Sequence, residues 1–294
     1  MLSTICSIRF SRAVGLLDNR PNDLLDIRRV QPLIGAEIHG IDISKPLDPA
    51  TRDAIRAAVV KHKVVFFRDQ QLDNDAQTRF ARQFGTPYTH PSPNRDQKIA
   101  SIHKIAAEDF KKYEVHDYAT RGDIYHSDTS WRLDPSWGAV LRAVNLPEVG
   151  GDTIWVDAHQ AYEGLSDELK ERLENLYVTH DFRRFLVPLG IDYPIVAHKV
   201  VRTHPESGQK ILWVNSTLNP QILGLELAES RRLVEEIVDL YKRPEYQVRF
   251  SWKAGSVAFW DNRGSLHYAV RNYGDYPRVM ERILIADEPI YAEI

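Results

Sequence analysis

The sequence predicts a mainly β fold with flanking helices, an α+β protein whose strands pack as a β-sandwich or jelly roll. Many short runs rich in β-branched and aromatic residues lie between turn signals, and only a few amphipathic segments are long enough for helices. No internal repeat or low-complexity linker divides residues 26–294. We therefore expect one domain over residues 26–294, preceded by an N-terminal extension over residues 1–25.

The strand predictions depend on period-two alternation, or on short apolar runs between turn residues. In chain order they are two short strands within 27–48, then 64–67, 137–147, 152–157, 199–215, 246–262 and 278–287. Turn signals at 205–208 and 253–255 predict that 199–215 and 246–262 are hairpins. Three tryptophans at strand positions, Trp155, Trp252 and Trp260, are expected to be core residues.

The helix predictions depend on apolar residues at helical spacing and on end signals. In chain order they are 49–63, 73–87, 166–176 and 226–242. The second starts at a capping Asp73, places Phe80 and Phe84 on one face and stops at Gly85. Because these helices are interspersed among strands, we expect them to pack outside a β core.

The charge and cysteine content exclude several classes of protein. A formal net charge of -3 over 294 residues leaves no basic excess to attract phosphate backbones or anionic membrane surfaces, so we expect neither nucleic acid nor membrane as a partner. The single cysteine, Cys6, excludes an intramolecular disulfide and argues against a cysteine-based zinc site. This usage is typical of a reducing compartment, so we expect a cytoplasmic protein.

The N-terminal extension has two interpretations. It is serine-rich, carries Arg9 and Arg12 and has no acidic residue before Asp18, so it weakly resembles an organellar transit peptide. A frayed extension without a targeting role is equally consistent with this composition, and we favour it because chain termini are commonly disordered.

The stretch DIYHSDTSW, at 123–131, places two polar groups among aromatic and β-branched neighbours. In a strand, residues i and i+2 point to the same face, so His126 and Asp128 would project together and could hold one metal ion. The pair alone is weak support, because a chain with 11 histidines will contain such a pair by chance.

A second constellation strengthens the metal prediction. His267 follows a predicted strand, and Arg278 and Arg282 come 11 and 15 residues later in the sequence. Two histidines and one carboxylate form the facial triad of non-haem Fe(II) oxygenases, which leaves three adjacent coordination positions open. Zinc would suit the same ligands, but ferrous iron with an anionic co-substrate also explains the cationic residues just beyond the third ligand.

Five stretches together resemble one known family: YHSD at 125–128, GGDTIWVD at 150–157, VVRTHPESGQK at 200–210, YQVRFSW at 246–252, and 260–282. They are similar to the taurine dioxygenase and 2,4-dichlorophenoxyacetate dioxygenase (TauD/TfdA) family of Fe(II)/2-oxoglutarate enzymes. The resemblance extends from about Val30 to Tyr291. It implies a double-stranded β-helix, which is the cupin-like jelly-roll core, with the metal inside.

The resemblance also implies a role for each motif residue. His126, Asp128 and His267 would hold Fe(II), which 2-oxoglutarate would chelate, with O2 as the second co-substrate. Arg278 and the hydroxyl of Thr153 would bind the far carboxylate of 2-oxoglutarate. In isolation, Arg278 would be read as a surface ion-pair residue and Thr153 as an ordinary strand residue.

The implied reaction is decarboxylation of 2-oxoglutarate to succinate and CO2, coupled to hydroxylation of a C–H bond. In the taurine dioxygenase pattern, a second arginine and a histidine grip the substrate sulfonate. Arg282 and His90 match them here, which implies a small organic anion as substrate. Pro93 and Gly122 replace polar residues of that pattern, and Leu218 replaces a pocket phenylalanine. These changes favour an alkylsulfonate or an alkyl sulfate ester over taurine.

Other functions remain open at this point. The enzyme could be an aryloxyalkanoate dioxygenase, or a biosynthetic hydroxylase or desaturase of the same fold that acts on a carboxylic acid. Retention of Asp128 argues against halogenation, because halide would need the position of the carboxylate. A noncatalytic cupin-like binding protein would not need Thr153 and Arg278. We also expect a homo-oligomer, either a dimer or a tetramer.

Overall fold

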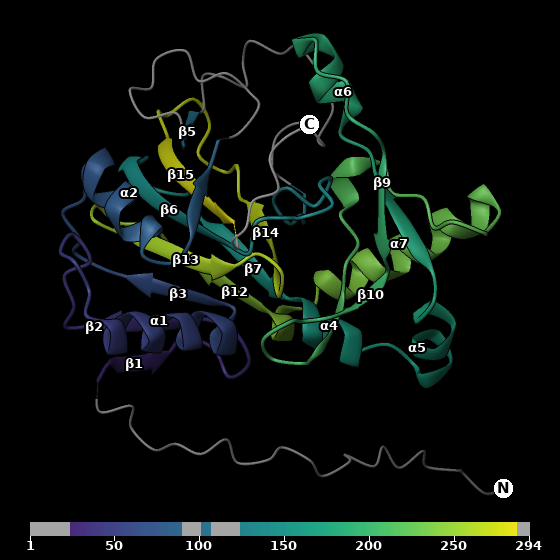
Figure 1. Ribbon diagram of the computed structural model, residues 1–294, viewed down its shortest axis with the longest axis horizontal. Helices are drawn as coiled ribbons and strands as arrows, with labels where there is room; N and C mark the ends of the chain where they lie inside the picture. The colour runs from purple at the N-terminus through teal and green to yellow at the C-terminus, as the bar shows by residue number, and fades with distance from the viewer. Residues whose placement is uncertain (1–23, 90–100, 107–123, 287–294) are drawn as a thin grey trace, which may run out of the picture.

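The computed structural model describes residues 24–89, 101–106 and 124–286 of the chain. It is mostly sheet with a few helices, as Figure 1 shows, which confirms the predicted mainly β fold. The strands are β1 (Asp26–Arg29), β2 (Ala36–His39), β3 (Val64–Phe67), β4 (Thr86–Tyr88), β5 (Ile102–Ala106), β6 (Gly138–Asn145), β7 (Thr153–Asp157), β8 (Tyr177–His180), β9 (Val196–Lys199), β10 (Val201–Thr203), β11 (Lys210–Leu212), β12 (Gln247–Phe250), β13 (Val257–Asp261), β14 (Ser265–Ala269) and β15 (Val279–Ala286).

The helices begin close to the residues that the sequence marks as caps. The α-helices are α1 (Pro49–His62), α2 (Asn74–Arg82), α4 (Ala158–Glu163), α5 (Asp167–Leu173), α6 (Arg183–Leu186) and α7 (Leu227–Tyr241), and the 3-10 helices are η2 (Val187–Leu189), η3 (Ser216–Leu218) and η4 (Pro244–Tyr246). The Asp73 side chain accepts from the backbone N–H of Ala76 at the start of α2, which satisfies a donor that would otherwise be unpaired. None of the helices in the described ranges is long and apolar enough to cross a membrane.

Two sheets face each other across a shared buried core. The larger has the order β1-β2-β3-β13-β6-β15-β4, with β5 also pairing β15, and the smaller has the order β12-β7-β14. One buried cluster takes Phe66, Trp260 and Met280 from the larger sheet, and Trp155 and Phe250 from the smaller. Trp155 and Trp260 are therefore core residues, as predicted.

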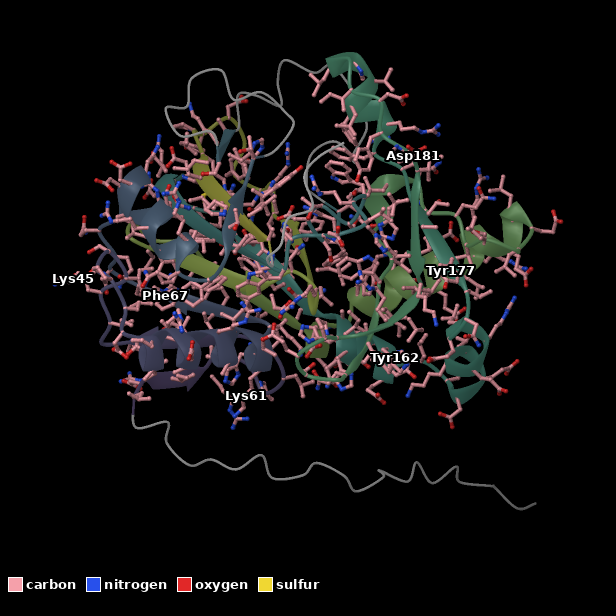
Figure 2. All side chains as sticks on the ribbon, viewed as in Figure 1. Lys45, Lys61, Phe67, Tyr162, Tyr177 and Asp181 are labelled. Carbon is pink, nitrogen blue, oxygen red and sulfur yellow. The ribbon has the colours of Figure 1, made fainter. Side chains whose placement is uncertain are left out.

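Alternate residues of the larger sheet pack against helices on its other face. In VVFF, Val65 and Phe67 join Ile55 of α1 and Phe80 of α2, whereas Val64 and Phe66 face the smaller sheet. All four residues are buried, because both faces of the strand are covered. This burial explains why the strand is a continuous apolar run and not an alternating one. Figure 2 labels Phe67 within this interior, and Lys45 and Lys61 at the periphery.

The other helices cover the outer face of the smaller sheet. A separate buried cluster joins Val156 of β7 and Leu266 of β14 to Ala161 of α4, Leu173 of α5 and Ile237 of α7. Figure 1 shows α5 and α7 on the opposite side of the molecule from α1 and α2, with α4 nearer the centre. The β core therefore lies between two helical layers, and the smaller sheet directs its inner face away from α4, α5 and α7.

One predicted hairpin is wrong. The segment 199–215 forms the hairpin β10–β11, but β12 and β13 do not pair with each other: β12 pairs β7 in the smaller sheet, and β13 pairs β3 and β6 in the larger. The turn at 253–255 therefore crosses between the sheets. Val248 and Ala258, from the two strands, pack into the same cluster from opposite sides, which a flat hairpin would not allow.

Candidate active site

The three predicted metal ligands lie together. The backbones of His126 and His267 exchange two hydrogen bonds, with N···O distances of 3.0 and 2.8 Å, which sets their imidazole centroids 4.1 Å apart. Each histidine Nε2 lies 3.9 Å from a carboxylate oxygen of Asp128. One ligand atom from each residue can be chosen so that all lie within 4.8 Å of one another. In the described part of the chain, no other group of His, Cys, Asp and Glu meets this test.

Asp128 does not lie on a strand, so that part of the prediction is wrong. His126 forms an isolated β-bridge with His267, and the chain then turns at Asp128. The next residue, Thr129, has φ +53°, which is a strained conformation for a β-branched side chain. The carboxylate reaches the histidines through this turn and not through strand alternation.

The protonation states of the ligands suit a metal. The Nδ1 of His126 lies 2.8 Å from the Ile124 carbonyl, which can only accept, so Nδ1 carries a proton and Nε2, on the side of Asp128, is the atom left to bind a metal. Burial, followed by the nearby His126, holds the pKa of His267 well below its usual value, so this imidazole is neutral. Two imidazoles and one carboxylate form a donor set that suits a divalent transition metal.

Arg278 is buried where β7 begins. Its Nε donates to the Gly151 carbonyl at 3.0 Å, and none of the acidic residues in the described ranges forms an ion pair with it. Burial lowers the pKa of Arg278, so this charge would gain from an anionic partner. A Cβ on Gly151 would lie 3.0 Å from Cδ and Nε of Arg278, and Gly151 has φ +73°, so glycine is required beside the arginine.

Thr153 is buried two residues after Gly151, and Trp252 fixes its hydroxyl. The Trp252 Nε1–H, which can only donate, lies 3.0 Å from the Thr153 Oγ1. The hydroxyl therefore accepts from Trp252 and keeps its own hydrogen to donate elsewhere. Nothing in the sequence predicts this contact, because Trp252 at a strand position indicates only a core residue.

Arg282 of β15 contacts the candidate metal ligand directly. Its Nη1 donates to Asp128 Oδ1 at 2.6 Å, and both side chains are largely buried. The Arg282 Nε is buried and has no hydrogen-bond partner among the described residues. A guanidinium with donors to spare therefore lies beside the three ligands, as expected for a residue that binds an anion.

The remaining predicted substrate residues are only partly placed. Leu218 is buried in a small cluster with Trp131 and Leu186. Trp131 lies three residues after Asp128 in the chain. His90 and Gly122 lie outside the described residues, as does Pro93. A role for Leu218 in the substrate pocket stays a prediction.

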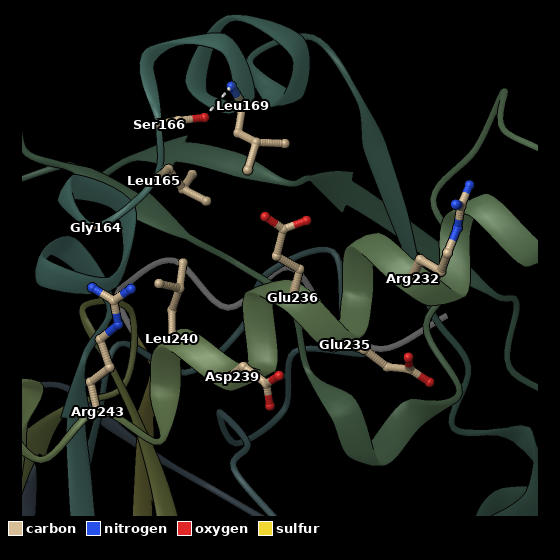
Figure 3. A pocket seen from close by; sticks show the side chains of 10 residues that line it. All are labelled: Gly164, Leu165, Ser166, Leu169, Arg232, Glu235, Glu236, Asp239, Leu240 and Arg243. Carbon is tan, nitrogen blue, oxygen red and sulfur yellow. Dashed lines mark hydrogen bonds between the residues drawn. The ribbon is translucent and has the colours of Figure 1, made fainter. Parts of the chain in front are cut away.

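A surface pocket lies elsewhere, between the α4–α5 connection and α7. Figure 3 shows Glu235, Glu236 and Asp239 of α7 along this pocket, with Leu165 and Ser166 opposite. None of the predicted metal, 2-oxoglutarate or substrate residues lines it.

Comparison with known proteins identifies the family. Residues 26–284 match the family described as taurine catabolism dioxygenase TauD, TfdA family. The chain belongs to this family. It is therefore a dioxygenase, and the predicted resemblance is confirmed.

Individual relatives have closely related names. The chain is 35% identical to an alpha-ketoglutarate-dependent sulfate ester dioxygenase of Pseudomonas putida, over 90% of each chain. It is 34% identical to an alkylsulfatase of Acinetobacter baylyi, over 91% of this chain and 87% of the relative. The structure matches a taurine dioxygenase from Burkholderia xenovorans with a TM-score of 0.78 and 34% identity, over 90% of this chain and 91% of the other.

Proposed function

We propose that this dioxygenase uses Fe(II) and 2-oxoglutarate to hydroxylate a C–H bond of a small organic anion, and that the anion is an alkyl sulfate ester or an alkylsulfonate. The observation that carries the substrate class is Arg282, whose largely buried guanidinium touches Asp128 and has an Nε donor without a partner among the described residues. The names of the two sequence relatives support sulfate esters in particular, and favour them over aryloxyalkanoates.

We assign the metal to His126, Asp128 and His267, whose clustered nitrogen and oxygen donors fit Fe(II). We assign the far carboxylate of 2-oxoglutarate to Arg278 and Thr153. When both are bound, iron and 2-oxoglutarate supply an oxidant at the expense of O2, with succinate and CO2 as products. The protein positions the reactants: Arg282 would hold the anion, and the buried surroundings of His267 would keep water away from the metal.

Hydroxylation of the carbon that bears the sulfate oxygen explains how an oxygenase would release sulfate. The product is a hemiacetal-like sulfate, which collapses to an aldehyde or ketone and the free sulfate ion. The apolar part of the substrate would lie near Leu218 and Trp131, whose side chains supply no hydrogen-bond acceptor for an ammonium group such as that of taurine.

Three broader features belong to the same proposal. Two facing sheets with a shared core support a double-stranded β-helix, that is, a jelly roll. The domain over 26–294 is supported by a family match that begins at residue 26. The cytoplasmic location and the dimer or tetramer stay predictions from the sequence.

A panel of anions tests the substrate class. With Fe(II), 2-oxoglutarate and O2 present, medium-chain alkyl sulfates should yield succinate and sulfate in equal amounts, and alkylsulfonates should yield sulfite. Taurine should be a poorer substrate, because Pro93 and Gly122 stand where the taurine dioxygenase pattern has polar residues. An aryloxyacetate should also be poorer, because the sequence relatives that support this proposal are named for sulfate esters. Taurine turnover above that of every alkyl sulfate and alkylsulfonate would contradict the proposed substrate.

A second prediction concerns the hydroxyl of Thr153. Thr153→Val should raise the dissociation constant of 2-oxoglutarate by about 10-fold, the range expected for one hydrogen bond to a charged group. Trp252→Phe should raise it several-fold, because the hydroxyl loses the donor that orients it. The double variant should bind 2-oxoglutarate no more weakly than Thr153→Val alone, since both changes act through one contact.

The matched control is Trp260→Phe, because the Trp260 Nε1 is buried without a hydrogen-bond partner among the described residues. Binding is measured by titrating 2-oxoglutarate into the Mn(II)-loaded protein. If Trp260→Phe weakens binding as much as Trp252→Phe does, loss of indole packing and not of the hydrogen bond is responsible.

A further inference from the structure

The turn that carries Asp128 is not in a relaxed conformation. Thr129 has a positive φ of 53°, although β-branched residues rarely adopt it. Such a conformation persists only when surrounding contacts hold it. The turn therefore needs a partner that determines where the Asp128 carboxylate points.

Asn262 is that partner. It is fully buried in the turn between β13 and β14, and its Oδ1 accepts from the Asp128 N–H at 2.8 Å. Its Nδ2 donates to the Asp128 carbonyl at 2.7 Å and to the Ser136 carbonyl at 3.1 Å. A backbone N–H can only donate and a carbonyl can only accept, so these contacts fix the orientation of the amide.

One side chain therefore holds both backbone groups of the metal ligand. Its contact with Ser136 also closes the far end of the same loop, where the Thr129 Oγ1 accepts from the Ser136 N–H at 2.8 Å. Without Asn262, the Asp128 N–H and carbonyl would be buried without these partners, and the loop could relax from the strained conformation of Thr129.

The position of Asn262 in the chain adds a second consequence. It lies five residues before His267, on the segment that leads into β14. The segment that delivers the second histidine therefore also holds the loop of the carboxylate. The turn between β13 and β14 therefore links the positions of two of the three proposed ligands, Asp128 and His267.

We propose that Asn262 is a positioning residue for the metal centre: its amide clamps the Asp128 turn and so sets the geometry of the carboxylate ligand. The inference depends on the proposed function only through the assignment of Asp128 as a ligand. Loss of a contact that orients a metal ligand typically weakens metal binding by about 10- to 100-fold.

A matched pair of variants tests it in the full-length protein. Gln77 is also a fully buried amide that donates to two backbone carbonyls, those of Val140 and Glu281, but it touches none of the proposed ligands. Asn262→Ala and Gln77→Ala should both lower the Tm. Only Asn262→Ala should weaken Mn(II) binding, by about 10- to 100-fold, measured from free Mn(II) by electron paramagnetic resonance.

The outcomes separate the two claims. If wild type and Asn262→Ala bind Mn(II) with dissociation constants within about twofold, or if Gln77→Ala loses as much affinity, the clamp is only structural and the inference is overturned. If Asn262→Ala does not fold, Asn262→Asp keeps the shape and the acceptor but not the amino donor, and it should show the same direction of change. Failure of the wild type to bind Mn(II) would overturn the proposed function as well.

Discussion

His267→Ala should weaken Mn(II) binding by more than about 100-fold, beyond the loss expected for a residue that only orients a ligand, and should abolish succinate formation. His267 contributes one of three donors, and its Nε2 lies 3.9 Å from Asp128. The remaining histidine and carboxylate leave the metal with too few protein ligands. Mn(II) titration and a succinate assay at saturating Fe(II) measure the two effects separately.

The control for this variant is His159→Gln. His159 is a half-buried histidine on α4 whose Nδ1 lies 2.9 Å from the Lys210 carbonyl, and it is outside the candidate site. It should retain metal binding and turnover. If folded His267→Ala keeps the wild-type affinity for Mn(II), His267 is not a metal ligand.

Arg282→Gln should lower kcat/KM for an alkyl sulfate by about 100-fold or more, because it removes a charged partner that would donate more than one hydrogen bond to the anion. Slow decarboxylation of 2-oxoglutarate without substrate oxidation should persist, since Arg278 and Thr153 are intact. The measurement compares succinate with sulfate release at saturating metal, because Arg282 also contacts Asp128.

Arg142→Gln provides the matched arginine control. Arg142 on β6 pairs with Glu281, the neighbour of Arg282 on β15, and successive strand residues point to opposite faces of the sheet. This variant should lose stability but keep its kcat/KM for the anion. An equal loss of kcat/KM in both variants would mean that Arg282 acts through the sheet and not on the substrate.

The fold could be predicted as far as local patterns determine it. Short apolar runs identify β3 and β13, and capping residues identify α2, because these signals act between residues close in sequence. The choice of sheet for each strand is not local. The turn at 253–255 looks like a hairpin turn, yet β12 and β13 enter different sheets, because apolar faces on both strands can be buried equally well across a shared core.

The candidate site could likewise be predicted only in part. The composition of a facial triad predicted that His126, Asp128 and His267 would lie together, and the structure brings them together. Arg282 was selected through the family resemblance, and its role toward the substrate stays a prediction. The spacing of His126 and Asp128 suggested a strand, whereas the structure has a strained turn at Thr129. The roles of Trp252 and Asn262 could not be predicted, because each depends on a hydrogen bond to a residue about 100 or more positions away.

The most direct test of the account is an anaerobic titration of the Fe(II)-loaded protein with 2-oxoglutarate. Chelation at an iron held by two histidines and one carboxylate should produce a visible metal-to-ligand charge-transfer absorption, and Arg278→Gln should require much more 2-oxoglutarate to reach it. A folded, iron-loaded wild type that binds 2-oxoglutarate without this absorption, or does not bind it, would contradict the assignment of the centre.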